Sequence, residues 1–185
     1  MNVTIRPATA ADAPLIAWAI VTAIGPEIIE SIGRPDLVEA MFADLARRDD
    51  TQYSWRNVSI AVAPDGHDAG VVVAYDGAGL DTMRRHFFAQ VAIRFGRDMS
   101  DMGDETDAGE VYLDTLAVLP QYRRQGVANA LIGAARSRAC AAGKPLGLLV
   151  EKENHRARRL YDAAGFVAVG ERPFAYTMMD HMQLV

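Results

Sequence analysis

The order of strand-like and helix-like segments is the feature that most limits the fold of this chain. Runs rich in β-branched and apolar residues predict seven strands, at "NVTI", "NVSIAVA", "GVVVAYD", "EVYLDTLAV", "PLGLLVE", "GFVAVGE" and "YTMMDHMQLV". Strands joined by a short loop pair antiparallel, whereas parallel neighbours need a helical crossover between them. Both kinds of connection occur here. The sequence therefore predicts an α/β fold with a mixed central sheet of about seven strands, flanked by helices.

Capping and turn residues mark where the predicted helices begin and end. Thr9, with Asp12 three residues later, is a typical N-terminal capping pair for the apolar run that follows. Gly25-Pro26 and Arg34-Pro35 interrupt the next segment, which predicts one or two short helices. Helical periodicity predicts three further helices, over Leu80–Phe95, Gly126–Ala142 and Asn154–Ala164.

Length and composition indicate one folded domain spanning residues 1–185. Half of the residues are hydrophobic and 23% are charged, as in ordinary globular proteins. The net charge of −5 argues against a general nucleic-acid binder, because such proteins neutralise phosphates with basic residues. No stretch approaches the about 20 apolar residues that span a bilayer, and the N-terminus lacks a signal-peptide pattern. We therefore expect no membrane partner and a cytoplasmic location.

The cysteine and histidine content predicts that the protein has no metal site. Cys140 is the single cysteine, so an internal disulfide and a cysteine-based zinc site are excluded and a reducing compartment is favoured. The four histidines, at positions 67, 86, 155 and 181, show no metal-ligand spacing. In the acidic segment 96–110, Met102 and Gly109 stand where a calcium loop requires oxygen ligands. We therefore expect that segment to be a solvated loop.

The stretch "LPQYRRQGVANAL", Leu119 to Leu131, leads from a predicted strand into a predicted helix. The first backbone N–H groups of a helix lack internal partners and attract anions. Gly126 and Ala128 leave room for a phosphate to approach them, and Arg123 and Arg124 add positive charge. The stretch therefore suits a pyrophosphate, although a strand-to-helix turn with solvent-facing arginines is the simpler alternative.

Two motifs resemble the signatures of the GCN5-related N-acetyltransferase (GNAT) superfamily. Residues 123–128, "RRQGVA", resemble its R/Q-x-x-G-x-G/A pattern, and "LLVEKENHRARRLYDAAGF", 148–166, looks like its second signature in the right order. "TIRPATAADAPLIAWAI" and the hairpin before the central strand are similar to other parts of the family. The resemblance covers most of the chain and is weakest from Asp76 to Gly109. Arg124 and Ala128 depart from the pattern, because many members have glycine there.

The resemblance implies a sheet splayed at its middle and a site for acetyl-CoA. By that likeness Arg123, Arg124, Gln125, Gly126, Val127 and Ala128 would bind the pyrophosphate, and Leu116, Ala117, Val118 and Asn154 would bind the pantetheine arm. Tyr161 matches the tyrosine that protonates the coenzyme A sulfur. Two alternatives stay open, since Asn154 is also an ordinary helix N-cap and Tyr161 is also placed to pack on Phe166.

Catalysis on an amine also requires a base, because the amine arrives protonated at neutral pH. Glu110, Tyr112 and Asp114 share one face of the central strand by the period of two. We predict Asp114 as the base because it lies nearer the expected thioester, with Glu110 second; simple solvation of both is the alternative. Seven further residues are candidates for the acceptor pocket: Glu27, Glu30, Trp55, Tyr75, Asp76, Asp180 and His181.

Together these observations predict an acetyl-CoA-dependent N-acetyltransferase that acts on a primary amine of a small molecule or peptide. We expect direct attack in a ternary complex, because Cys140 lies inside a predicted helix without a histidine to activate it and is expected to be buried. The alternative is a non-catalytic acyl-CoA-binding or interaction module. Transfer of a longer acyl group or transfer to an alcohol also stays open, as does a homodimer.

Overall fold

The fold is a mixed seven-stranded sheet between two helical layers. The structure, a computed structural model, describes the whole chain except Tyr176 and the side chain of Glu27. The strands follow the order β1-β2-β3-β4-β5-β7-β6. Their bounds are β1 Thr4–Pro7, β2 Val58–Val62, β3 Asp68–Asp76, β4 Val111–Val118, β5 Leu146–Glu151, β6 Val167–Phe174 and β7 Thr177–Leu184. The predicted α/β fold with about seven strands is thus confirmed.

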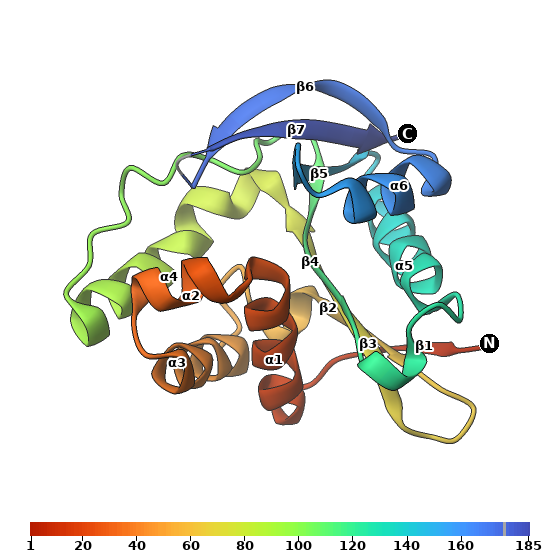
Figure 1. The fold of residues 1–185 in the computed structure, drawn as a ribbon, viewed down its shortest axis with the longest axis horizontal. Coiled ribbons are helices and arrows are strands. Elements are labelled where there is room, and N and C mark those ends of the chain that lie inside the picture. Colours follow the sequence, from red (N-terminus) through yellow and green to blue (C-terminus); the bar gives the residue numbers. More distant parts are fainter. Residues whose placement is uncertain (176) are drawn as a thin grey trace.

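Six α-helices cover the two faces of the sheet in the part of the chain that the structure describes. They are α1 Ala13–Ile24, α2 Pro26–Ile32, α3 Pro35–Arg47, α4 Leu80–Phe95, α5 Val127–Ala141 and α6 His155–Ala164. Helices α1 to α4 gather on one face, and α5 and α6 lie on the other (Figure 1). The described helices include none with the length and apolar character that crossing a membrane requires.

Short-range polar contacts fix the entry of the chain into α1. The backbone N–H of Thr9 donates to Asp12 Oδ2 at 2.8 Å, which confirms the predicted capping pair. Arg6 lies 2.8 Å from Asp12 Oδ1 and 3.0 Å from Asp68 Oδ1. The hydrogen bond from Arg6 lowers the pKa of Asp12 to about 2. One arginine therefore connects β1, the start of α1 and β3.

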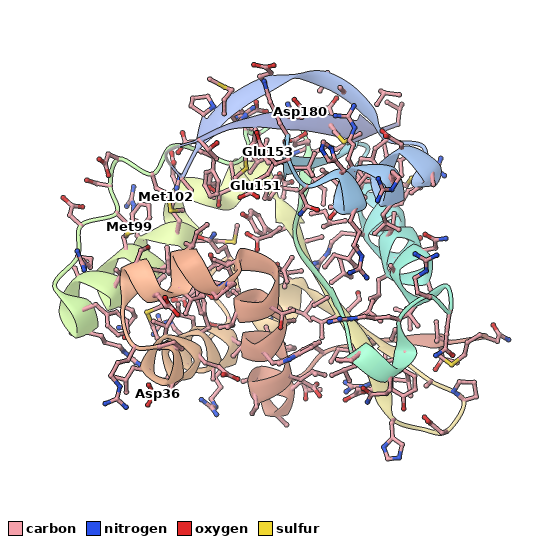
Figure 2. All side chains as sticks on the ribbon, viewed as in Figure 1. Asp36, Met99, Met102, Glu151, Glu153 and Asp180 are labelled. Carbon is pink, nitrogen blue, oxygen red and sulfur yellow. The ribbon has the colours of Figure 1, made fainter. Side chains whose placement is uncertain are left out.

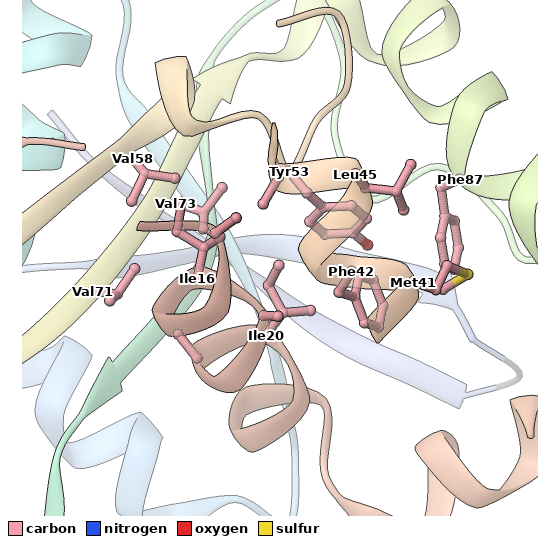
Figure 3. Close-up of a cluster of buried hydrophobic side chains, with 14 of the residues drawn as sticks. Ile16, Ile20, Met41, Phe42, Leu45, Tyr53, Val58, Val71, Val73 and Phe87 are labelled. Carbon is pink, nitrogen blue, oxygen red and sulfur yellow. The ribbon is translucent and has the colours of Figure 1, made fainter. Parts of the chain in front are cut away.

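The core under α1 to α4 supplies one wall of the site described below. Ile16 and Ile20 of α1 pack beside Phe42 of α3 and against the sheet (Figure 3). The Phe42 ring lies 5.0 Å from the Tyr53 ring, edge to face, and 5.7 Å from the Phe87 ring. Such aromatic pairs add stability beyond their buried area. The cluster holds Tyr53 and Phe87 in fixed positions.

Strands β4 and β5 separate soon after they meet. Their parallel pairing consists of Val111 with Leu146 and Tyr112 with Gly147, although β4 continues to Val118. The splay that the family resemblance implied is therefore present, and it leaves the β5-facing edge of β4 without a strand partner among the described residues.

A β-bulge lies in β4 where the splay opens. Val73 of β3 pairs with Thr115 but the next residue, Ala74, pairs with Leu113, so Asp114 is the extra residue on β4. Ala117 consequently packs with the core under α1, whereas Leu116 packs toward α5. A bulge of this kind re-aims side chains, which is why a strict period of two does not describe the whole strand.

The segment 96–110 is not the solvated loop that its sequence predicts. Met102, Glu105 and Thr106 are buried, with 8%, 2% and 2% of their surface exposed. The segment passes so close to Gly77, the residue after β3, that a Cβ atom there would lie 1.9 Å from the Asp107 carbonyl oxygen. The prediction was wrong because hydrogen bonds to distant residues, rather than apolar periodicity, hold this segment against the sheet.

Candidate active site

A cavity of about 970 Å³ passes through the sheet where β4 and β5 separate. On the α5–α6 side its described wall includes Leu116, Val118, Arg123, Arg124, Gly126, Val127, Ala128, Asn154, Arg156, Arg159 and Tyr161. On the α1–α4 side it includes Ile24, Ile28, Ile32, Tyr53, Phe87, Met99, Met102, Glu105, Tyr112, Asp114 and Phe174. One continuous space therefore joins the predicted phosphate loop to the predicted base.

The N-terminus of α5 opens into this cavity. Gly126 has φ = +86° and precedes the first helical residue, Val127, and the helix runs for 15 residues. Arg123 is tied back to β4 by its Nε, which donates to the Val118 carbonyl at 3.0 Å. Gly126, Val127, Ala128 and both arginines line the cavity. The exposed N–H groups of the first turn therefore face a space that an anion can enter.

Gln125 is the member of this loop that does not line the cavity. Its side chain donates to the Gln121 carbonyl at 2.8 Å, and its own carbonyl accepts from the Met1 amino group at 2.8 Å. These contacts turn its side chain along the loop, away from the cavity wall. Leu116, Ala117 and Val118 line the cavity on the unpaired edge of β4, where the resemblance placed them.

Arg124 stands in a conformation that normally favours glycine. Its φ is +63°, in the left-handed region, where a residue with a Cβ is disfavoured by about 1 kcal/mol. This position is one of the two departures from the family pattern. The backbone keeps the geometry that glycine would adopt, and the arginine side chain then adds a positive charge to the cavity wall.

Helix α6 contributes two cavity arginines that sequence reasoning missed. Arg156 and Arg159, three residues apart, share the cavity-facing side of the helix. Among the described residues neither has a carboxylate partner, whereas Arg158 pairs with Asp162 at 3.0 Å and Asp180 at 2.5 Å. The three-residue spacing of these arginines, within the predicted signature 148–166, was the available signal.

Asn154 and Tyr161 line the cavity, and each also has the structural role that the sequence left open, Asn154 as the cap of α6 and Tyr161 in packing on Phe166. Asn154 Oδ1 accepts from the Ala157 backbone N–H at 3.0 Å and so caps α6, and its amide NH₂ is left for other partners. The Tyr161 ring packs edge to face on Phe166 at 5.5 Å. Burial raises the pKa of Tyr161 to about 12, so its hydroxyl keeps its proton at any physiological pH.

Asp114 is the predicted base that reaches the cavity. Its Oδ1 accepts from the Thr115 hydroxyl at 2.8 Å, and its Oδ2 accepts from the Tyr75 hydroxyl at 3.2 Å. Burial and the nearby charge of Glu105 raise the pKa of Asp114 to about 6. At pH 7 the group is therefore mostly ionised, yet it binds a proton more strongly than an ordinary aspartate.

Glu110 shares a strand face with Asp114 but does not line the cavity. Its carboxylate is buried over Gly147 and accepts from the Thr106 hydroxyl at 2.8 Å and from the Gln183 amide at 2.9 Å. His181 Nε2 lies 2.8 Å from it. The structure therefore does not bring Glu110 to a bound amine, because these groups enclose it beneath the segment 96–110.

Glu105 is a second cavity carboxylate that sequence reasoning missed. Its Oε1 accepts from the Gln52 amide and the Tyr75 hydroxyl, both at 3.0 Å, and its Oε2 lies 3.3 Å from Arg84. Burial raises the pKa of Glu105. Arg84 is buried and also pairs with Asp104. No sequence signal distinguished Glu105 from the four other acidic residues between Asp98 and Asp107.

Most other acceptor-pocket candidates lie away from the cavity. Tyr75 does not line the cavity, but its hydroxyl donates a hydrogen bond to Asp114, which does. Asp76 pairs with Lys144 at 2.6 Å. Four further candidates are not on the described wall: Glu30, Trp55, Asp180 and His181. The side chain of Glu27 lies outside the described residues. The described residues contain no group of three or more His, Cys, Asp or Glu side chains suited to a metal ion.

Cys140 is exposed, which corrects the prediction of a buried thiol. Helix α5 buries Leu131, Ala135 and Ala139 at intervals of four. Cys140 follows Ala139 and therefore points about 100° away from the buried stripe. It is not on the cavity wall, so its position does not suit a covalent intermediate.

Comparison with known protein families identifies the family to which the chain belongs. A family model described as the acetyltransferase (GNAT) family matches residues 39–166, most of the chain. The chain belongs to the GNAT family. Both GNAT signatures fall at or within the matched region, and the reaction class that the family supports is acetyl transfer.

Solved structures agree with this membership. An acetyltransferase crystal structure is 26% identical with a TM-score of 0.75, over 97% of both chains. An N-acetyltransferase from Staphylococcus aureus Mu50 is 18% identical with a TM-score of 0.81, over 98% of this GNAT chain and 100% of its own. The second likeness shows the fold alone. No protein of curated function matches the sequence.

Proposed function

We propose that this GNAT protein transfers the acetyl group of acetyl-CoA to a primary amine by direct attack in a ternary complex. The observation that supports the proposal most is the single cavity through the splay of β4 and β5. It has a phosphate-binding helix N-terminus on one side and an ionisable base, Asp114, on the other. When bound, acetyl-CoA supplies the acetyl group.

The residues on the α5–α6 side fit the anionic half of coenzyme A. A diphosphate needs backbone N–H donors and positive charge, and the first turn of α5 together with Arg123 and Arg124 offers both. The unpaired edge of β4 at Leu116–Val118 offers backbone donors and acceptors to the amides of the pantetheine arm. A β4 N–H on that edge is suited to polarise the carbonyl being attacked.

Asp114 acts as the base in this proposal. An ammonium group must lose a proton before its nitrogen can attack a carbonyl, and Asp114 accepts that proton directly or through a water. Its pKa of about 6 suits the task, because the group is ionised at pH 7 and is more basic than a solvated aspartate. Tyr75 and Thr115 hold both of its oxygens in place.

In this proposal Tyr161 donates its hydroxyl proton to the departing thiolate of coenzyme A, and solvent then returns a proton to the tyrosine. Burial keeps the hydroxyl protonated, with a pKa of about 12, and the packing on Phe166 holds the ring on the cavity wall. A non-catalytic acyl-CoA-binding module would need neither a protonated tyrosine nor a basic carboxylate in the same cavity. The presence of both favours an enzyme over that alternative.

We further propose that the protein works in the cytoplasm. Its one cysteine is exposed, and an exposed unpaired thiol persists best in a reducing compartment.

Consumption of acetyl-CoA across a panel of amines tests the proposed activity. We expect turnover by the wild-type protein, and Asp114→Asn and Tyr161→Phe should each lower kcat/KM by about 100-fold, a typical effect of removing a general base or acid. Both variants should still bind coenzyme A, because neither residue touches the proposed phosphate site. Binding without turnover of any amine would favour the non-catalytic module.

A further inference from the structure

We propose that the acceptor is an amphipathic monoamine, with one ammonium group on an alkyl or arylalkyl body, and that the α1–α4 half of the cavity selects it. This inference rests on the proposed function and specifies its substrate class. It excludes polyamines and amino sugars, which carry several charges or hydroxyl groups.

The walls of this half of the cavity are largely apolar. Phe87 and Met102 are buried side chains that border the space, and Ile28, Met99 and Phe174 are partly buried against the same core cluster. Met99 and Met102 lie on the segment between α4 and β4 (Figure 2). Methionine side chains adapt to irregular apolar ligands. The walls therefore favour a substrate body made of hydrocarbon.

The charges on these walls match one ammonium group. Glu105 faces Arg84, which lies 3.3 Å from its Oε2 and also pairs with Asp104, and the Glu105 Oε1 accepts from Gln52 and Tyr75, so protein groups already surround this carboxylate. Asp114 has no basic side chain as a partner among the described residues; its partners are hydroxyl groups of Tyr75 and Thr115. Asp114 is thus the described carboxylate next to the splay without a basic partner, and it attracts one cation and holds it beside the edge of β4.

A second cation would be poorly accommodated along the apolar walls. Moving an ammonium group from water into an apolar surrounding without a partner is strongly unfavourable. The remaining carboxylate on the described wall is Glu151, at the end of β5, and its side chain is exposed to solvent. An exposed carboxylate contributes little to binding a cation. A diamine could therefore gain little from Glu151 and would lose the apolar contacts.

A matched pair of substrates tests this inference with acetyl-CoA as the donor. Hexylamine and 1,6-diaminohexane have the same chain length and differ by the terminal amino group. We expect kcat/KM to rise about fourfold for each methylene from butylamine to hexylamine, as burial of hydrocarbon predicts. We expect 1,6-diaminohexane to be worse than hexylamine by about 100-fold.

A wall variant tests which side chains make the selection. Met99→Glu places a carboxylate in the apolar wall and should raise kcat/KM for the diamine about tenfold while lowering it for hexylamine. The control is Ile93→Glu, because Ile93 lies on α4 outside the cavity with 77% of its surface exposed. This control should leave both substrates unchanged.

Three results would overturn the inference. One is a wild-type kcat/KM for 1,6-diaminohexane that equals or exceeds the value for hexylamine. The contradiction would be strongest if Glu151→Gln then lowered the value for the diamine. Another is the absence of any dependence on alkyl length, and a third is transfer to amino sugars or peptides alone. Failure to bind coenzyme A together with no transfer to any amine would instead overturn the proposed function, and this inference with it.

Discussion

At the scale of single residues, one hydroxyl group connects two carboxylates of the cavity, Glu105 and Asp114. The Tyr75 hydroxyl lies 3.0 Å from Glu105 Oε1 and 3.2 Å from Asp114 Oδ2. A hydroxyl has a single hydrogen, so it can donate to only one of the two at a time. Burial and, after it, the negative charge of Glu105 raise the pKa of Asp114, while the hydrogen bond from Tyr75 opposes that rise.

The acid limb of the pH–rate profile should therefore move in opposite directions in two variants. The wild-type limb is expected near pH 6, where Asp114 becomes ionised. Glu105→Gln removes a negative charge, lowers the pKa of Asp114 and should shift the limb to lower pH by about half to one unit. Tyr75→Phe removes a stabilising donor, raises that pKa and should shift the limb to higher pH.

The measurement is kcat/KM against pH for both variants and the wild type, with thermal unfolding as a check that each is folded. A purely structural role would lower kcat/KM at every pH without moving the limb. Shifts of the two variants in the same direction would contradict the shared-hydroxyl account.

The residue-level site was only partly predictable from the sequence. The period of two correctly placed Asp114 on one face with Tyr112, and the signature spacing led to Tyr161. Glu105 could not be found this way, because its burial depends on Gln52, Tyr75 and Arg84, which lie between 21 and 53 residues away in the chain. Local patterns carry no information on such contacts.

At the scale of elements, α6 places two arginines on the cavity and keeps a third away from it. Arg156 and Arg159 line the cavity beside the proposed phosphate site. Arg158 points to the other side and pairs with Asp162 and Asp180. Coenzyme A carries a phosphate monoester besides its diphosphate, and such a group holds about −1.5 to −2 charge at pH 7.

Replacing the two cavity arginines should therefore affect binding of this third phosphate. We expect Arg156→Ala with Arg159→Ala to weaken coenzyme A binding by about 10- to 100-fold, the effect of losing one or two charge-assisted hydrogen bonds. Binding of 3′-dephospho-coenzyme A should change by less than about threefold. Isothermal titration calorimetry with both ligands measures the difference.

Arg158→Gln is the matched control on the same helix. It should leave both affinities unchanged and lower only the melting temperature, since its partners are Asp162 and Asp180. An equal loss of affinity for both ligands in the double variant would contradict a role for Arg156 and Arg159 at the third phosphate.

Element boundaries were more predictable than the paths of connecting segments. The capping pair at Thr9 and Asp12 marks a helix start where the sequence placed it, and α5 ends within one residue of its predicted end at Ala142, because caps act over a few residues. The segment 96–110 was mispredicted because its buried groups are satisfied by distant partners. The bulge at Asp114 likewise depends on pairing with β3.

At the scale of the whole molecule, the α5–α6 half and the α1–α4 half of the cavity meet where β4 and β5 separate. The net charge is −5, yet four arginines line the α5–α6 side of one cavity: Arg123, Arg124, Arg156 and Arg159. The uncompensated carboxylate Asp114 lies toward the α1–α4 side of the sheet. An anionic donor and a cationic acceptor would thus be drawn to opposite sides and meet at the unpaired edge of β4.

The most direct test of this account is a crystal structure of the chain with coenzyme A bound. We predict the diphosphate on the N–H groups at the start of α5, the pantetheine arm along Leu116–Val118 and the sulfur next to Tyr161. Coenzyme A bound elsewhere, or the α5 N-terminus blocked by side chains of the protein itself, would contradict the claim that acetyl transfer takes place in the splay.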